Sequence, residues 1–286
     1  MSTATTTVTR TRSRPVPTQR PLWHRVRAWL GRNALRIYAA LAFAYLFLPI
    51  AYITVFSFNI PGRQNLTWRG FTWENWQNPC GAPDVCPAVG NSLKIGLSAT
   101  LVATILGTMI AFALSRHRFH GRTATNLLIF LPMATPEVVL AASLLTLFLN
   151  TKVPLGFVTI ILAHVMFCIS FVVVAVKARI ASLDPRLEQA AADLYANETQ
   201  AFLRVTFPLV LPGIAGAALL AFSLSFDDYI ITVFNSGNVN TFPKFVYGSA
   251  QRGIPAQAYV IGAAMFFIAM IIALGSEAIR SRRRRG

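Results

Sequence analysis

Long uncharged stretches are the feature that most constrains this sequence. A helix that crosses a bilayer needs about 20 consecutive, mainly apolar residues. Six stretches reach that length, at 37–62, 95–115, 123–151, 153–176, 205–226 and 253–276, the third interrupted only by Glu137. Buried helices of a large soluble protein would be shorter and would carry a polar face. We therefore predict an all-α integral membrane protein with six transmembrane helices.

The basic residues indicate how these spans are oriented. The chain carries 26 Lys and Arg against 10 Asp and Glu, a net charge of +16. The excess lies before the first stretch, between the second and third, between the fourth and fifth, and after the sixth. Loops rich in Lys and Arg stay in the cytoplasm, so both termini are predicted to be cytoplasmic. The positive charge is then explained by the orientation of the spans and by attraction to anionic membrane lipid. Nucleic-acid binding is not needed to explain it.

Three regions follow from this pattern. Residues 1–36 contain no acid and form a basic tail that is predicted to be cytoplasmic and disordered. Its start also has the composition of an organellar transit peptide, but the charge bias elsewhere favours a bacterial inner membrane. Residues 37–280 form the six-helix domain, and 281–286 form a basic C-terminal tail. Within the third span, Pro132 and Pro136 each remove a backbone donor, which predicts a kink or a break.

The cysteines and the remaining motifs indicate neither a metal site nor a bound cofactor. Cys80 and Cys86 share a loop predicted to be external, where they either form a disulfide or remain as two thiols. Cys168 lies within the fourth span and is interpreted as a packing residue. No G-x-x-x-x-G-K-[ST] loop is present, so the chain is not expected to bind ATP by that motif.

A polar insert separates the fourth and fifth spans, at about 178–207. Asp184 and Pro185 predict a helix start, since an N-cap acceptor precedes a proline at the first helical position. The next apolar residues recur at helical spacing and form one face: Leu187, Ala190, Ala191 and Leu194. Such a helix either lies on the membrane interface or presents its face to a partner. Its acidic residues suit an anionic leaflet poorly, which favours the partner.

The insert resembles the EAA loop of ABC-importer permeases. Gln189-Ala190-Ala191, Tyr195 and the ending Val205-Thr206-Phe207-Pro208 follow the spacing of that loop. The resemblance implies a type I importer permease fold and a coupling helix that docks in a cleft of an ATPase subunit. Its docking residues would be Glu188, Gln189, Ala190, Ala191, Asp193, Leu194, Tyr195 and Pro208. Two positions depart from the pattern. Gln189 replaces the acid, with Glu188 adjacent, and Tyr195 replaces a glycine, which argues against a tight turn there.

Three further segments look like those of the spermidine/putrescine group of these permeases: "NSLKIGLSAT", "LPMATPEVVL" and "SFDDYIITVFNSG". The resemblance implies a subunit that imports polyamine across a bacterial inner membrane. It also implies the partners: a second permease, an ATPase dimer that holds ATP and Mg²⁺, and an external solute-binding protein. Similar permeases carry other small solutes such as amino acids, and that alternative stays open.

Carboxylates lie within the predicted spans, where they are costly and usually face a cavity, a partner or a pathway. Glu137, Asp227 and Asp228, with Phe226 and Tyr229, suit ammonium groups on a methylene chain. Adjacent helical residues point about 100° apart, so one aspartate can line the path while the other pairs or caps. The alternatives are structural: either aspartate pairs with Lys94, or Glu137 binds backbone donors freed by Pro132 and Pro136.

An enzyme is the competing class of function, and the sequence offers little for it. No H-E-x-x-H or G-x-S-x-G motif is present. His117 and His120 lie in a basic turn, and His164, alone in the fourth span, is predicted to be a hydrogen-bonded packing residue. A stand-alone secondary carrier remains an alternative, but it would leave the insert without a role.

Overall fold

The computed structural model describes residues 22–62, 65, 67–117 and 119–283, and their side chains except those of 22–32, 273 and 276–283. Helices are the regular elements of these ranges, besides an isolated antiparallel bridge between Asn59 and Phe71. The chain divides into two compact units, residues 1–52 and 53–286. The predicted all-α class is confirmed.

The helices have the following bounds: α1 Leu22–Phe56, α2 Glu74–Gln77, α3 Val85–Arg116, α4 Arg122–Ala134, α5 Glu137–Asn150, α6 Phe157–Ala181, α7 Arg186–Asp193, α8 Glu198–Ala201, the π-helix η1 Phe202–Thr206, α9 Phe207–Asp227, α10 Ile230–Asn235, α11 Phe242–Ala250 and α12 Ala256–Arg283. Because α1 begins at Leu22, the tail predicted to be disordered through residue 36 is helical over its last part. Residues 1–21 and 284–286, in the two predicted tails, lie outside the described residues.

Four helices of the described chain are long and apolar enough to span a membrane: Asn33–Phe56, Val85–Arg116, Phe157–Ala181 and Glu198–Asp227. The pair α4 and α5 passes the same test together, which makes a fifth span if the pair is one. The described apolar part of α12, Ala256–Ile272, is shorter. The described residues thus contain four or five candidate spans, and the predicted count of six stays a prediction.

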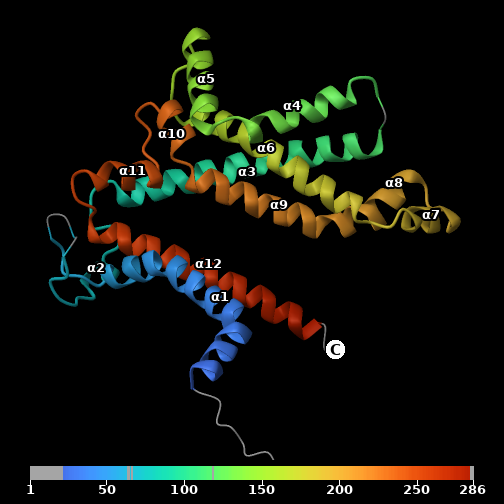
Figure 1. The fold of residues 1–286 in the computed structure, drawn as a ribbon. Coiled ribbons are helices and arrows are strands. Elements are labelled where there is room, and N and C mark those ends of the chain that lie inside the picture. The colour runs from blue at the N-terminus through green and yellow to red at the C-terminus, as the bar shows by residue number, and fades with distance from the viewer. Residues whose placement is uncertain (1–21, 63–64, 66, 118, 284–286) are drawn as a thin grey trace, which may run out of the picture. The chain divides into compact units, whose positions relative to one another are not determined.

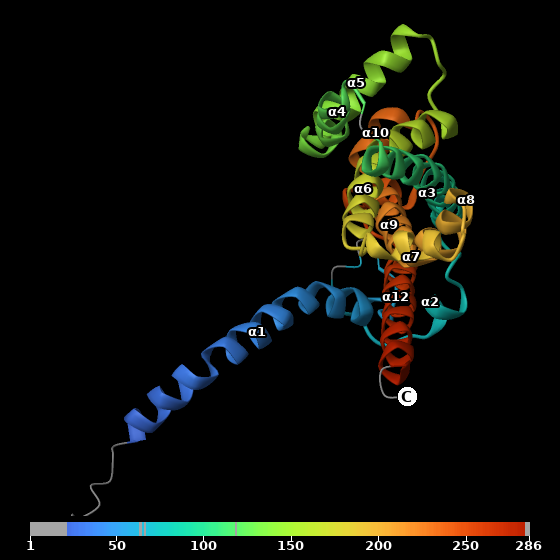
Figure 2. The same ribbon diagram turned by 90° about the vertical axis from the view of Figure 1, so that its right-hand side faces the viewer.

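The core of the second unit is a bundle of three helices, α3, α6 and α9, each of which packs against the other two (Figures 1 and 2). Small residues face the neighbouring helices every fourth position along α3: Ala99, Ala103, Gly107 and Ala111. A Cβ atom at Gly107 would lie 2.7 Å from Val172 of α6, so only glycine permits this approach. Small residues at helix interfaces allow close packing in membranes, where no hydrophobic effect drives helix association.

Two spans are broken, and the breaks position the candidate site. Between α4 and α5 the axis turns by 106° at Thr135 and Pro136, which confirms the predicted break, whereas Pro132 is accommodated inside α4. The second break follows the fifth predicted stretch, 205–226. Here α9 ends at Asp227, Asp228 is extended, and α10 begins at Ile230. No proline or glycine lies at this second break, so local sequence gave no signal for it.

Candidate functional site

The short helix predicted in the insert forms as α7, and two further short helical elements that were not predicted, α8 and η1, follow it before α9. The Asp184 carboxylate accepts a hydrogen bond from the Arg186 backbone N–H at 2.9 Å, at the start of α7. Of the predicted apolar face only Ala191 is buried within this chain. The other members, Leu187, Ala190 and Leu194, are exposed, as is Gln189. The face is therefore left without a partner in the described structure.

Tyr195 takes the backbone conformation that the usual glycine would supply. Its φ is +61°, in the left-handed region. The Ala196 N–H donates to Ala191 O at 3.0 Å and the Tyr195 N–H to Ala192 O at 2.9 Å, which is the Schellman pattern for ending a helix. The expectation that Tyr195 opposes a tight turn is wrong, because the turn forms around tyrosine. Holding a non-glycine residue there costs about 1–2 kcal/mol, and the side chain is 98% exposed.

Glu188, predicted to face the ATPase, is bonded within the chain. Its carboxylate accepts from the Arg116 guanidinium, at the end of α3, and from the Thr206 hydroxyl, at the end of η1. Arg116 also donates to Thr206 Oγ1 at 3.3 Å and lies over the Phe202 ring, 5.3 Å from its centroid. We call these four residues, Arg116, Glu188, Phe202 and Thr206, the insert cluster. Among the remaining predicted docking residues, Asp193, Leu194 and Pro208 are exposed.

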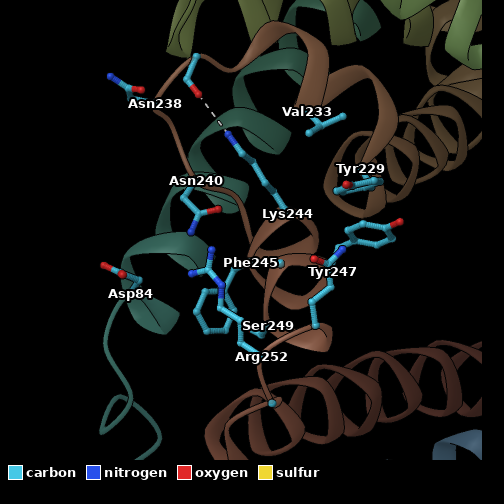
Figure 3. A pocket seen from close by; sticks show the side chains of 14 residues that line it. Asp84, Tyr229, Val233, Asn238, Asn240, Lys244, Phe245, Tyr247, Ser249 and Arg252 are labelled. Carbon is cyan, nitrogen blue, oxygen red and sulfur yellow. Dashed lines mark hydrogen bonds between the residues drawn. The ribbon is translucent and has the colours of Figure 1, made fainter.

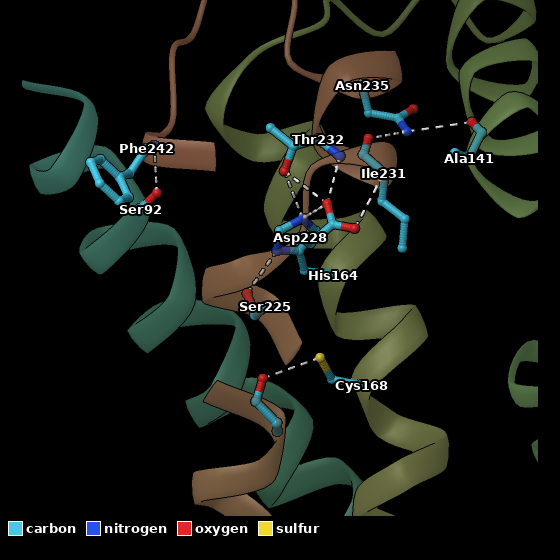
Figure 4. A network of polar contacts seen from close by, with 11 residues as sticks. Ser92, Ala141, His164, Cys168, Ser225, Asp228, Ile231, Thr232, Asn235 and Phe242 are labelled. Carbon is cyan, nitrogen blue, oxygen red and sulfur yellow. Dashed lines mark hydrogen bonds and ion pairs between the residues drawn. The ribbon is translucent and has the colours of Figure 1, made fainter. Parts of the chain in front are cut away.

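At the break between α9 and α10 the two neighbouring aspartates have different surroundings. Asp228 is 7% exposed. Its carboxylate accepts from the backbone N–H groups of Ile231 at 3.2 Å and Thr232 at 2.7 Å and from the Thr232 hydroxyl at 2.9 Å (Figure 4). It therefore caps α10, which supplies partners to donors that the broken helix leaves free.

His164 of α6 completes this buried network. Its Nε2 lies 3.1 Å from Asp228 Oδ2 and its Nδ1 lies 2.7 Å from Ser225 Oγ (Figure 4). A neutral ring with the proton on Nε2 satisfies both contacts, since the Ser225 hydroxyl can then donate to Nδ1. The prediction of a hydrogen-bonded packing histidine is confirmed. The proposed pairing with Lys94 is wrong, because the described part of the chain forms no Lys94–Asp ion pair.

Asp227 instead lines an open pocket of about 440 Å³. The pocket brings together four of the five residues predicted for a substrate path, Glu137, Asp227, Asp228 and Tyr229. Phe226 does not line it and packs towards Gly96 of α3 and Phe222. Phe167 of α6 supplies an aromatic ring there, which the sequence did not single out. Asp227 and Glu137 are exposed. The Glu137 side chain is hydrogen-bonded to that of Asp228. Its contacts among the described residues include none to the backbone near Pro132 or Pro136.

A second pocket, of about 790 Å³, lies beside α11 and shares Tyr229 with the first. Tyr229 stacks on Tyr247, with ring centroids 4.3 Å apart (Figure 3). Lys244 donates to Ser236 Oγ, Gly237 O and Val239 O at 2.7–3.1 Å, which uses all three of its N–H groups. Burial lowers the pKa of Lys244. This lysine therefore fixes the loop between α10 and α11.

The loop before α3 is closed by a disulfide between Cys80 and Cys86, with Cα atoms 5.4 Å apart. Farther back, the Asn59 side chain donates to Asn65 Oδ1 and Thr67 O, and Asn75 donates to Ser57 O and Asn59 O. No group of three or more His, Cys, Asp or Glu suited to a metal ion occurs in the described ranges.

The comparison with known protein families decides which class of membrane protein this is. Residues 103–285 match the family described as "Binding-protein-dependent transport system inner membrane component". This chain belongs to that family. It is 32% identical over 249 residues to the spermidine/putrescine transport system permease protein PotC of Haemophilus influenzae, covering 87% of this chain and 95% of the relative.

Two further relatives from Escherichia coli strain K12 agree. The protein named PotC is 30% identical over 258 residues, covering 90% of this chain and 97% of the relative. The putrescine transport system permease protein PotI is 36% identical over 223 residues, covering 75% and 79%. The sequence-based assignment to importer permeases is confirmed.

Solved structures share the fold. A bacterial ABC transporter that imports the acidic polysaccharide alginate aligns with a TM-score of 0.63 at 17% identity, covering 90% of this chain and 99% of that one. An amino acid ABC transporter aligns with a TM-score of 0.53 at 18% identity, covering 70% of this chain and 94% of that one. At these identities the likeness establishes the type of fold.

Proposed function

We propose that this family member is one permease subunit of an ATP-driven importer of polyamines, putrescine or spermidine. The observation that carries the proposal is its similarity to PotC proteins over about nine-tenths of its length. The pocket at the α9–α10 break supports it. Exposed carboxylates of Glu137 and Asp227 lie there with the rings of Tyr229 and Phe167, and such a set can hold an ammonium group by charge and by cation–π contact.

The chain would form half of the path, and the partners would complete it. A second permease would face the open side of the pocket, and an external solute-binding protein would deliver the polyamine. The hydrolysis of ATP would occur on a separate ATPase dimer. The insert is the part of this chain suited to dock on it, because Leu194 and Tyr195 are 82% and 98% exposed at its tip. Solvent-exposed apolar side chains grouped in this way mark an interaction surface.

The orientation proposed from the basic loops is consistent with this arrangement. With both termini in the cytoplasm, the insert and the end of α3 lie on the side where ATP is available. The disulfide loop between Cys80 and Cys86 then lies on the external side, where disulfides persist. Movement of the ATPases would shift the insert and rock the spans between outward-facing and inward-facing states.

Uptake of labelled putrescine and spermidine tests this function. Cells that lack their own polyamine uptake would express this chain with its partner subunits, with either an intact or a disabled ATPase. We expect uptake that requires the intact ATPase. An assembled complex that hydrolyses ATP but takes up neither polyamine would contradict the substrate, and a screen of amino acids and other small solutes would follow.

A further inference from the structure

The insert is joined to the three-helix core at one polar point. Among helices, α7 packs mainly on η1 and α8, its sequence neighbours. Behind it, a pocket of about 250 Å³ lies between α7 and the ends of α3 and α6. The side chains that cross from α7 to α3 are those of Glu188 and Arg116. A helix with a pocket behind it and few contacts to the core can shift without moving the core. For α7 to transmit movement to α3, the contact between Glu188 and Arg116 must therefore persist.

The contacts of the insert cluster form a closed triangle. Arg116 donates to both Glu188 and Thr206, and the Thr206 hydroxyl donates to the same carboxylate oxygen. Each of the three belongs to a different element, α3, α7 and η1. None of them can therefore move away from the other two without breaking two contacts. An exposed ion pair alone stabilises little, and Arg116 and Glu188 are 34% and 45% exposed. Here the Thr206 hydroxyl and the Phe202 ring also contact Arg116, and these contacts restrict the orientation of its guanidinium in a way that an isolated ion pair does not.

Aromatic packing extends this attachment into the core. The Phe202 ring under Arg116 also meets Phe112 of α3, with centroids 5.1 Å apart, and Phe207 of α9 at 6.0 Å. Phe202 begins a π-helical turn, a rare form that frequently marks functional sites. From there α3 runs along α9 as far as Gly96, where an added Cβ would lie 3.2 Å from Phe222. Packing contacts thus connect the insert to α9, the helix that ends at Asp227.

We propose that Arg116 and Glu188 are positioning residues that fix the insert to α3, so that insert and core move as one body during transport. The proposal rests on the proposed function, because it needs an ATPase to move the insert. It differs from docking, since Glu188 acts here inside the chain and not on the partner. The proposal requires that the contacts of the insert cluster persist throughout the transport cycle. If these contacts are broken, the complex should hydrolyse ATP without a matching uptake of polyamine.

The test measures polyamine uptake and ATP hydrolysis by the whole complex, in vesicles containing this chain and its partners. Glu188→Gln should lower the ratio of putrescine taken up to ATP hydrolysed by about fivefold or more, the range of a typical coupling free energy. Glu198→Gln, which changes an exposed acid of the same insert at the start of α8, should leave the ratio as in the unmodified chain. A Glu188→Gln complex with an unchanged ratio would overturn the proposal. No uptake by the unmodified complex would instead count against the proposed function.

A covalent link separates positioning from a mere effect on folding. In a chain with Arg116→Cys and Glu188→Cys, the ratio should be low, and a short thiol-reactive crosslinker between the two positions should restore it. Hydrolysis without uptake after crosslinking would show that the cluster must open, and would overturn the proposal. The remaining cysteines do not interfere, since Cys168 is buried and Cys80 and Cys86 are bonded to each other.

Discussion

Two carboxylates in this protein are held in the same way in different surroundings. At the α9–α10 break, Asp228 is bonded to a base on another helix, His164, and to a threonine hydroxyl, that of Thr232. At the insert, Glu188 is bonded to Arg116 and to the hydroxyl of Thr206. The Asp228 network is almost fully buried, whereas Arg116 and Glu188 are partly exposed.

This difference determines what each carboxylate can do. Breaking a buried pair leaves polar groups without water or a partner, which costs several kcal/mol. Breaking an exposed pair returns both groups to water and costs little. The buried network therefore stabilises the fold at the α9–α10 break. The contacts of the exposed insert cluster can form or break without unfolding the chain, so they can determine whether movement of the insert reaches α3. The predictions below test this contrast.

The largest effect is expected from His164→Leu. This change leaves the Asp228 carboxylate and the Ser225 hydroxyl without their buried partner, and we expect a loss of about 3 kcal/mol in the free energy of unfolding. His120→Leu, at an exposed position, should cost far less. Thermal unfolding of the purified complex would measure both, and equal stability of the two variants would remove the structural role of the network.

An intermediate effect is expected from Tyr195→Gly. Glycine relieves the left-handed strain at φ +61° but loses more entropy on folding, so the free energy of unfolding should change by less than about 1 kcal/mol. Loss of the exposed ring should weaken binding of the ATPase about tenfold or more, as for a tyrosine hot spot. Titration of the ATPase onto the permeases in vesicles checks this. Unchanged affinity would show that Tyr195 is not part of the docking surface.

The smallest effect is expected from Glu188→Gln on stability. The exposed pair should contribute less than about 1 kcal/mol to unfolding, and high salt should reduce even that difference by screening. The loss caused by His164→Leu should not depend on salt, because its partners are buried. Unfolding temperatures at low and high ionic strength would decide. The contrast would be contradicted if the stability loss caused by His164→Leu depended on salt and the loss caused by Glu188→Gln did not.

Local patterns predicted the elements well, and contacts between distant residues poorly. The start of α7 just after Asp184 and Pro185 and the break near Pro136 were predictable, because short-range side-chain hydrogen bonds and prolines act within a few residues. The pairs His164–Asp228 and Arg116–Glu188 join residues 64 and 72 positions apart, and nothing local indicates them. The turn at Tyr195 was mispredicted because backbone bonds to Ala191 and Ala192 outweigh an unfavourable φ.

The aspartate pair shows the same limit. Helical spacing indicated that Asp227 and Asp228 face different ways, but not which of them caps and which lines the pocket. That choice depends on the break in the helix after Asp227 and on His164 of α6.

The most direct test compares Asp227→Asn with Asp228→Asn, measuring the amount of assembled complex and the uptake of labelled putrescine per assembled complex. For Asp227→Asn we predict normal assembly and about tenfold lower uptake, since a hydrogen bond to a charged group contributes roughly 1.5–3 kcal/mol. For Asp228→Asn we predict less assembled complex. Normal uptake with Asp227→Asn, together with a fully assembled but inactive Asp228→Asn complex, would contradict the account.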